Sequence, residues 1–291
     1  MIKLENLIKS VPLAIFAVLT PLTIGLAAWS LYFVPPAGSL TVVPINFFSP
    51  LKLQAQAAVV YDPVRNQIIF AKNADQVLPI ASLTKLMTTL VAAETLPPQT
   101  EVSTSDGRRW HLSDLINFTL VTSFNDGANN LAAAAGAASG GSTSTFIAKM
   151  NATANQLNLN HTKFDNPSGL DLDSATPGAQ STATEVAKLM AYIVSHHPSL
   201  LADTVQAVLT VPSLSGPQLA INTNTAASSF PGLIASKTGF TDLAQGNLAI
   251  TFDAGLNQPL VAVVLGSSET GRLRDARTLE LAAIKYVAHD H

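Results

Sequence analysis

Strand-forming runs lie at the two ends of the region after residue 56, and helical patterns fill the space between them. Residues 57–61 and 67–70 are rich in β-branched and aromatic side chains, and the turn residues between them predict a hairpin. Three more strands are expected near the end of the chain, at 233–241, 248–252 and 259–265, and the last two are predicted to form a second hairpin. The sequence therefore predicts an α+β domain with one antiparallel sheet. We expect its first and last helices to cover this sheet and a mostly helical lobe to lie beside it.

The helices are expected from apolar periodicity and from the residues that begin or end them. The first would begin at Ser82, after Pro79, and continue through residues 83–93, which are mostly good helix formers. Others are predicted at 112–121, 129–138, 144–157, from Ser181 or Thr182 to about 195, and at 270–288.

The N-terminal part of the chain has no charged residue between Lys9 and Lys52. Residues 11–34 form an apolar stretch that exceeds the roughly 20 residues needed to cross a bilayer. We expect a single-pass anchor in the cell membrane, with residues 1–10 as a cytoplasmic tail, 35–56 as a linker and 57–291 as an extracytoplasmic domain. A cleaved signal peptide is the alternative, although its apolar core normally spans only about 7–15 residues.

Composition excludes several classes of function. The net charge is −3 and no Lys/Arg cluster is present, so nucleic acid is not expected as a partner. With no cysteine, the chain has no disulfide framework, thiolate nucleophile or cysteine metal site. The pairs His196/His197 and His289/His291 lack a matched set of ligands, so no metal and no cofactor is expected.

Ser82 and Lys85 are three residues apart, which on a helix brings their side chains together at roughly 5–6 Å. A hydroxyl beside an amine is a nucleophile beside a possible base. A serine at a helix start is also commonly no more than a cap, so the pair alone does not decide between these interpretations.

Two further motifs follow in order. Ser123-Phe124-Asn125 has the form Ser-x-Asn, and Lys237-Thr238-Gly239 lies on a predicted strand. Together with Ser-x-x-Lys they form the signature of class A β-lactamases and penicillin-binding proteins.

The text around these motifs narrows the resemblance. The stretches PIASLTKLMT, TSFNDGANNLA, FIAKMNATANQLNLNHTKFDNPSGLD and SKTGFTD closely resemble the low-molecular-mass penicillin-binding proteins of the D-alanyl-D-alanine carboxypeptidase family. These are serine peptidases with the β-lactamase/transpeptidase-like fold. The resemblance covers the chain from about Ala57 to its end.

The resemblance implies a serine-type carboxypeptidase that removes the terminal D-alanine from peptidoglycan stem peptides. Ser82 would attack the carbonyl between two D-alanines and form an acyl-enzyme. Lys85 would take the proton, so its pKa must fall well below about 10.4. Burial would lower this pKa, and so would a second cation, for which Lys237 is the candidate. β-Lactams would act as covalent inhibitors.

The remaining roles are also implied by the resemblance. Ser123 would relay a proton to the leaving amine, and Asn125 would hold the substrate backbone and Lys85. Lys237 and Thr238 would bind the substrate carboxylate, and Gly239 would leave room for the substrate.

The oxyanion hole would be formed by the backbone N–H groups of Ser82 and Phe240. Asp171 and Asp173 lie in a loop that could supply the activator of the hydrolytic water.

Two features depart from the family pattern. Phe124 occupies a position that is usually small, and Ser123 follows Ser82 at a shorter interval than usual. We therefore expect a narrower or reshaped cleft with a trimmed wall.

Other functions stay open to different degrees. A class A β-lactamase would need a glutamate to activate the deacylating water, and Glu185 is the only glutamate between Asn125 and Lys237. A muropeptide D,D-endopeptidase would use the same residues. A non-catalytic, membrane-tethered receptor for peptidoglycan or β-lactams is the alternative from another class, and Phe124 is the feature in its favour.

Overall fold

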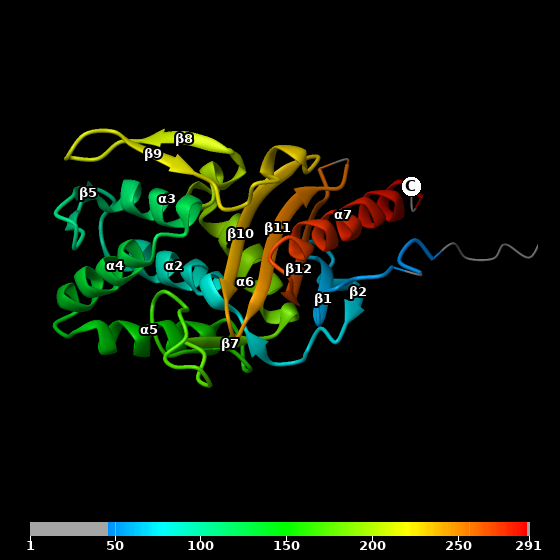
Figure 1. Cartoon of the computed structure of the whole chain (residues 1–291), viewed down its shortest axis with the longest axis horizontal. Helices are drawn as coiled ribbons and strands as arrows, with labels where there is room; N and C mark the ends of the chain where they lie inside the picture. The colour runs from blue at the N-terminus through cyan, green and yellow to red at the C-terminus, as the bar shows by residue number, and fades with distance from the viewer. Residues whose placement is uncertain (1–45, 50, 256, 290–291) are drawn as a thin grey trace, which may run out of the picture. The chain divides into compact units, whose positions relative to one another are not determined.

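A five-stranded antiparallel sheet forms the centre of the computed structural model, which describes residues 46–49, 51–255 and 257–289. The strands follow the order β10-β11-β12-β1-β2 (Figure 1). Their bounds are Ala57–Asp62 for β1, Gln67–Lys72 for β2, Leu233–Thr241 for β10, Gln245–Asp253 for β11 and Pro259–Ser267 for β12. The predicted α+β class with an antiparallel sheet is confirmed, including both predicted hairpins.

Both faces of the sheet are buried. Along β1, Ala57, Val59 and Tyr61 belong to one hydrophobic core, whereas Ala58 and Val60 belong to a second core on the opposite face. This alternation follows from the two-residue period of a strand, and it requires a covering layer on each side.

The helices are α2 (Lys85–Thr95), α3 (Leu112–Thr122), α4 (Asn125–Ala138), α5 (Thr143–Gln156), α6 (Ala183–His196) and α7 (Gly271–His289). The final helix, α7, covers one face of the sheet through Ala276, Leu279 and Ala283. The first helix does not cover the other face as predicted; α6 packs there. The eight residues from Lys85 to Ala92 are all buried, and a helix buried on every side belongs inside the helical lobe.

Several short elements were not predicted from the sequence. Strands of two to four residues form three small sheets. In the first, β7 (Ala179–Ser181) pairs with β3 (Leu78–Pro79) on one side and β6 (Lys163–Phe164) on the other. The other two are the pairs β4 (Glu101–Ser103) with β5 (Arg109–His111), and β8 (Val208–Val211) with β9 (Gln218–Ile221). Four 3₁₀ turns complete the described elements: η1 (Ala81–Thr84), η2 (Pro198–Leu200), η3 (Ala202–Val205) and η4 (Ala227–Ser229).

The linker predicted at 35–56 includes residues that pack against the domain. Phe48 stacks on Phe70 with ring centroids 5.3 Å apart, and Ala55 is fully buried against α7. The compact domain therefore begins before residue 57. The predicted tail, the predicted anchor at 11–34 and residues 35–45 lie outside the described residues. Within the described part, no helix has the length and apolar character to cross a membrane.

Candidate active site

Ser82 lies in the 3₁₀ turn η1, immediately before α2, rather than at the cap of an α-helix. Within the described residues its side chain makes no capping hydrogen bond, and its Oγ accepts from Lys85 Nζ. Ala81 itself has φ 47°, a left-handed conformation that a non-glycine residue rarely adopts. Such local strain is found most often at functional sites, where the surrounding structure enforces it.

Lys85, the first residue of α2, has a fully buried side chain that points to three oxygen atoms. Its Nζ donates to Ser82 Oγ at 2.7 Å, to Asn125 Oδ1 at 2.8 Å and to the main-chain oxygen of Ser168 at 2.9 Å. None of these partners carries a charge, so no counter-ion offsets the desolvation of the ammonium form. Burial lowers the pKa of Lys85 to about 7.

The Ser123-Phe124-Asn125 motif forms the tight turn between α3 and α4. Ser123 ends α3 with φ 59°, and Asn125 begins α4. The Asn125 amide oxygen faces Lys85, so its N–H group is free to point elsewhere.

Phe124 does not narrow the cleft as expected. Its ring packs edge-on against Phe118 at 5.6 Å, and the Arg108 guanidinium lies 5.2 Å from its centre. Arg108 also lies 5.3 Å from the ring of Trp110. The left-handed backbone at Ser123 turns the Phe124 ring into this aromatic cluster.

Strand β10 supplies the opposite side of the cleft. Lys237 is buried and donates to Ser123 Oγ at 3.0 Å and to the main-chain oxygen of Thr238 at 2.9 Å. Burial, followed by the nearby charges of Lys85 and Arg272, holds the pKa of Lys237 well below its usual range. The sequence predicted that the charge of Lys237 would help to lower the pKa of Lys85. In the structure, burial alone lowers the pKa of Lys85, and the charge of Lys85 helps to lower the pKa of Lys237.

Gly239 is required by the protein as well as by any substrate. A Cβ atom here would lie 2.8 Å from the main-chain oxygen of Ile80 and 3.2 Å from the nitrogen of Ser82. The expectation that Gly239 only leaves room for substrate is therefore incomplete. The absence of a side chain lets the nucleophile turn approach β10 directly.

Arg272, in the first turn of α7, was not predicted as a site residue. It is 6% exposed, and its Nη1 donates to the main-chain oxygen of Gly239 at 2.8 Å. A sequence signal existed, since Arg272, Asp275 and Leu279 share the spacing of the buried face of α7. An arginine on the buried face of a helix indicates a specific partner, because a buried charge is costly without one.

These residues line one cleft of about 380 Å³. Its walls comprise Ser82, Ser123, Asn125, Leu170, Thr223, Thr238, Gly239, Phe240, Glu269 and Arg272. The structure thus brings together the residues of all three motifs, with Lys85 and Lys237 buried immediately beneath through their bonds to Ser82 and Ser123. A nucleophile, a base of lowered pKa and a cationic group share this cleft.

Three acidic residues considered from the sequence have structural contacts instead. Asp171 accepts from Thr241 Oγ1 and from the N–H of Leu243, and Asp173 caps its own turn. Glu185 is buried and accepts from His161 and from Thr162 Oγ1. None of these contacts joins an acidic group to Ser82 or Lys85.

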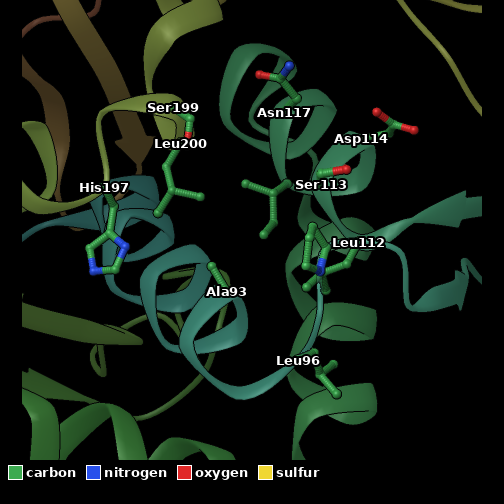
Figure 2. Close-up of a pocket in the computed structure, with 11 residues that line it drawn as sticks. Ala93, Leu96, Leu112, Ser113, Asp114, Asn117, His197, Ser199 and Leu200 are labelled. Atoms are coloured by element: carbon green, nitrogen blue, oxygen red, sulfur yellow. The ribbon is translucent and has the colours of Figure 1, made fainter.

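A second pocket, of about 300 Å³, lies between the end of α2, the start of α3 and residues 197–200 (Figure 2). It combines apolar side chains with Asp114, Asn117 and His197. The His197 ring pairs with Glu94 at 3.2 Å, and no hydrogen bond in the described part of the chain joins it to a serine. Ser113 and Ser199 also line this pocket, but among the described residues neither pairs with a base as Ser82 pairs with Lys85 in the cleft.

Comparison with known proteins agrees with this arrangement. The family model for D-alanyl-D-alanine carboxypeptidase matches residues 45–269. The chain is 30% identical over 259 residues to the D-alanyl-D-alanine carboxypeptidase DacB2 of Mycobacterium tuberculosis, covering 84% of this chain and 83% of that protein. It is 28% identical over 253 residues to the D-alanyl-D-alanine endopeptidase of Escherichia coli, covering 80% of this chain and 77% of that protein.

A solved structure extends the comparison to three dimensions. Penicillin-Binding Protein D2 from Listeria monocytogenes, in its ampicillin-bound form, superposes with a TM-score of 0.71 at 30% identity. The alignment covers 80% of this chain and 98% of that chain. With the family match spanning both walls of the cleft up to Glu269, the chain belongs to the D-alanyl-D-alanine carboxypeptidase family.

Proposed function

We propose that this protein is a serine-type D-alanyl-D-alanine carboxypeptidase that trims peptidoglycan stem peptides through an acyl-enzyme on Ser82. The observation that carries this proposal is the 2.7 Å contact between Lys85 Nζ and Ser82 Oγ. Because burial lowers the pKa of Lys85 to about 7, a large fraction of this amine is neutral near neutral pH and can accept a proton.

Acylation begins when Ser82 Oγ bonds to the carbonyl carbon of the penultimate D-alanine and its proton passes to Lys85 Nζ. The N–H groups of Ser82 and Phe240 stabilise the oxyanion. The C–N bond then breaks, and the leaving D-alanine amine takes a proton through Ser123 Oγ. Water later attacks the acyl carbonyl, and Ser82 Oγ leaves with a proton.

Substrate orientation rests on groups at both walls. Asn125 accepts from Lys85 through its oxygen, which supports use of its N–H group on the peptide backbone of the substrate. Thr238 and Arg272 line the cleft and offer donors for the terminal carboxylate, with the Lys237 amine buried beside them. An arginine binds such a group through two parallel hydrogen bonds. A carboxylate subsite is what makes a peptidase act at the chain end.

β-Lactams are proposed to acylate the same serine. The Listeria relative was solved with ampicillin bound, which supports this assignment for a chain with the same fold.

We also propose that residues 11–34 anchor the protein in the cell membrane, with the domain on the extracytoplasmic face. Protease treatment of intact cells should leave the domain uncut until the outer barriers are opened.

The decisive experiment labels the wild type and Ser82→Ala with a fluorescent penicillin. We expect a labelled wild-type band and no labelled variant band, and wild type should release D-alanine from a pentapeptide stem. An unlabelled wild type would overturn the acyl-enzyme and favour a non-catalytic receptor.

The similarity to an endopeptidase gives a second candidate for the physiological bond. The two activities are separated by giving the wild type a pentapeptide and a crosslinked muropeptide dimer. Cleavage of the dimer without release of D-alanine from the pentapeptide would assign the protein as an endopeptidase.

A further inference from the structure

Residues 53–56, which we call the N-terminal strap, join the start of β1 to the first turn of α7. The N–H of Ala55 donates to Asp275 Oδ2 at 2.7 Å, and the N–H of Gln56 donates to the main-chain oxygen of Leu265 at 2.9 Å. On the other side, Lys72 Nζ donates to the main-chain oxygens of Leu53 and Ala55 at 3.0 and 2.6 Å. The strap is therefore held from both sides.

Asp275 is the buried end of this connection. It is 1% exposed, and its Oδ2 accepts from Ala55 N–H and from Ser267 Oγ, the latter at 2.8 Å. A carboxylate removed from water is strongly stabilised by N–H and O–H donors, so their loss is costly. These two contacts tie α7 both to the strap and to the end of β12.

Gln54 holds the first turn of α7 at a second point. Its Oε1 accepts from Ser268 Oγ at 2.9 Å and from Arg274 Nη2 at 3.3 Å. The amide fits because residue 271 is glycine: a Cβ there would lie 2.1 Å from Gln54 Oε1. The helix start is thus shaped around this side chain.

Arg272 lies between these two points of attachment. Gly271 precedes it beneath Gln54, and Asp275 follows one helical turn later. Its guanidinium is held to the sheet by the bond to Gly239, while its buried Nε has no partner within the described residues. The direction of this side chain is therefore set largely by where the first turn of α7 lies.

We infer that the N-terminal strap is a positioning element of the carboxylate subsite: Gln54 and Ala55 fix the start of α7 so that Arg272 faces the end of the substrate. This inference rests on the proposed carboxypeptidase function. The strap touches no substrate itself and acts only through Arg272. Residues 53–56 therefore influence which substrate end the cleft prefers.

The test uses the full-length chain and two diacetylated tripeptides that end in D-Ala-D-Ala. One peptide has a free C-terminal carboxylate and the other has a C-terminal amide. Gln54→Ala is the main variant because its side chain is exposed, and the fold should survive. Arg272→Ala sets the largest loss of preference for the free carboxylate that can be expected. Asp275→Asn tests the buried contact between the strap and α7. Phe48→Ala is the control, since Phe48 packs on Phe70 and Tyr286 away from Arg272.

Wild type should prefer the free carboxylate, and Arg272→Ala should remove this preference. Gln54→Ala and Asp275→Asn should reduce it by about tenfold, mainly through KM, while the amide peptide is turned over nearly as before. Phe48→Ala should keep the preference even if its melting temperature falls.

Strap variants that discriminate as strongly as wild type, or that lose both substrates equally, would overturn the inference while leaving the proposed function intact. A wild type that releases neither D-alanine from the free-acid peptide nor D-alaninamide from the amide peptide would overturn both.

Discussion

The two walls of the cleft each bury a lysine, and the two lysines differ in what they hold. Lys85, on the helical wall, donates to the nucleophile, to Asn125 and to a loop oxygen. Lys237, on the sheet wall, donates to Ser123 and to its own strand. Both therefore reach the same turn between α3 and α4, but only Lys85 has a hydrogen bond to Ser82 within the described residues.

This difference suggests a division of labour. Lys85 is surrounded by uncharged acceptors, which suits a base that must give up its charge. Lys237 joins the two walls through Ser123, so its loss should disturb geometry and substrate binding before it removes the base. Substitutions at the two lysines should therefore differ in size and in kind.

The largest effect is expected for Lys85→Met, which keeps the volume of the side chain and removes the base. The acylation rate should fall by about a thousandfold or more, because general-base catalysis contributes roughly 10²–10⁴-fold. The rate of labelling by fluorescent penicillin measures this loss. Lys188→Met, at an exposed lysine, is the matched control and should label at the wild-type rate. A loss below tenfold in Lys85→Met would show that another group accepts the proton.

Lys237→Met should have a smaller effect, about a hundredfold on kcat/KM, because it removes a bond to Ser123 but leaves the Ser82–Lys85 pair. Much of the loss should appear in KM for the carboxylate peptide. Steady-state kinetics on the free-acid and amide peptides would resolve it. Equal losses in Lys85→Met and Lys237→Met would contradict the division of labour.

The pH dependence of acylation tests whether a base with the pKa of Lys85 takes part. Burial lowers the pKa of Lys85 to about 7, so the neutral amine increases as the pH rises. The acylation rate should therefore rise about tenfold between pH 6 and pH 8 and then level off. Stopped-flow acylation with a chromogenic cephalosporin measures the profile, with tryptophan fluorescence as a check that the fold is intact. A flat profile over this range would exclude Lys85 as the titrating base.

The smallest catalytic effect is expected for Phe124→Ala. The ring lies in the cluster with Phe118 and Arg108, not in the cleft, so acylation should change by no more than about twofold at a temperature where the variant is folded. Stability should fall by about 2 kcal/mol, as for a partly buried aromatic residue. Chemical denaturation and penicillin labelling measure the two quantities separately. A large gain or loss of labelling without loss of stability would return Phe124 to the cleft wall.

Most large elements could be predicted from the sequence because local signals are strong there. The first hairpin depends on Asp62, whose side chain accepts from the N–H groups of Val64 and Arg65 and stabilises the turn. Strands β11 and β12 carry apolar runs between turn residues. The strands of two to four residues have no such pattern, since neighbouring segments in space create them.

The sequence predicted those site residues whose role depends on the type of side chain. It did not predict contributions that depend on the backbone or on how the elements pack. Ser168 contributes a main-chain oxygen to Lys85, and its side chain gives no sign of this. Arg272 enters the cleft because α7 begins beside β10, a proximity that depends on strand order. The direction of Phe124 depended on the backbone at Ser123, so its identity alone led to the wrong expectation.

The position of β1 between β2 and β12 has a consequence for how the protein is made. Ala57 pairs with Leu265, so the sheet closes only after the chain has been synthesised past residue 265. The Ser82 turn leaves the ribosome well before Lys237 and the strands that bury it. Contacts so distant in sequence form slowly and leave unpaired strand edges exposed in the meantime. The nascent chain therefore carries its serine in an unreactive state until Lys237 and the strands that follow it have been made.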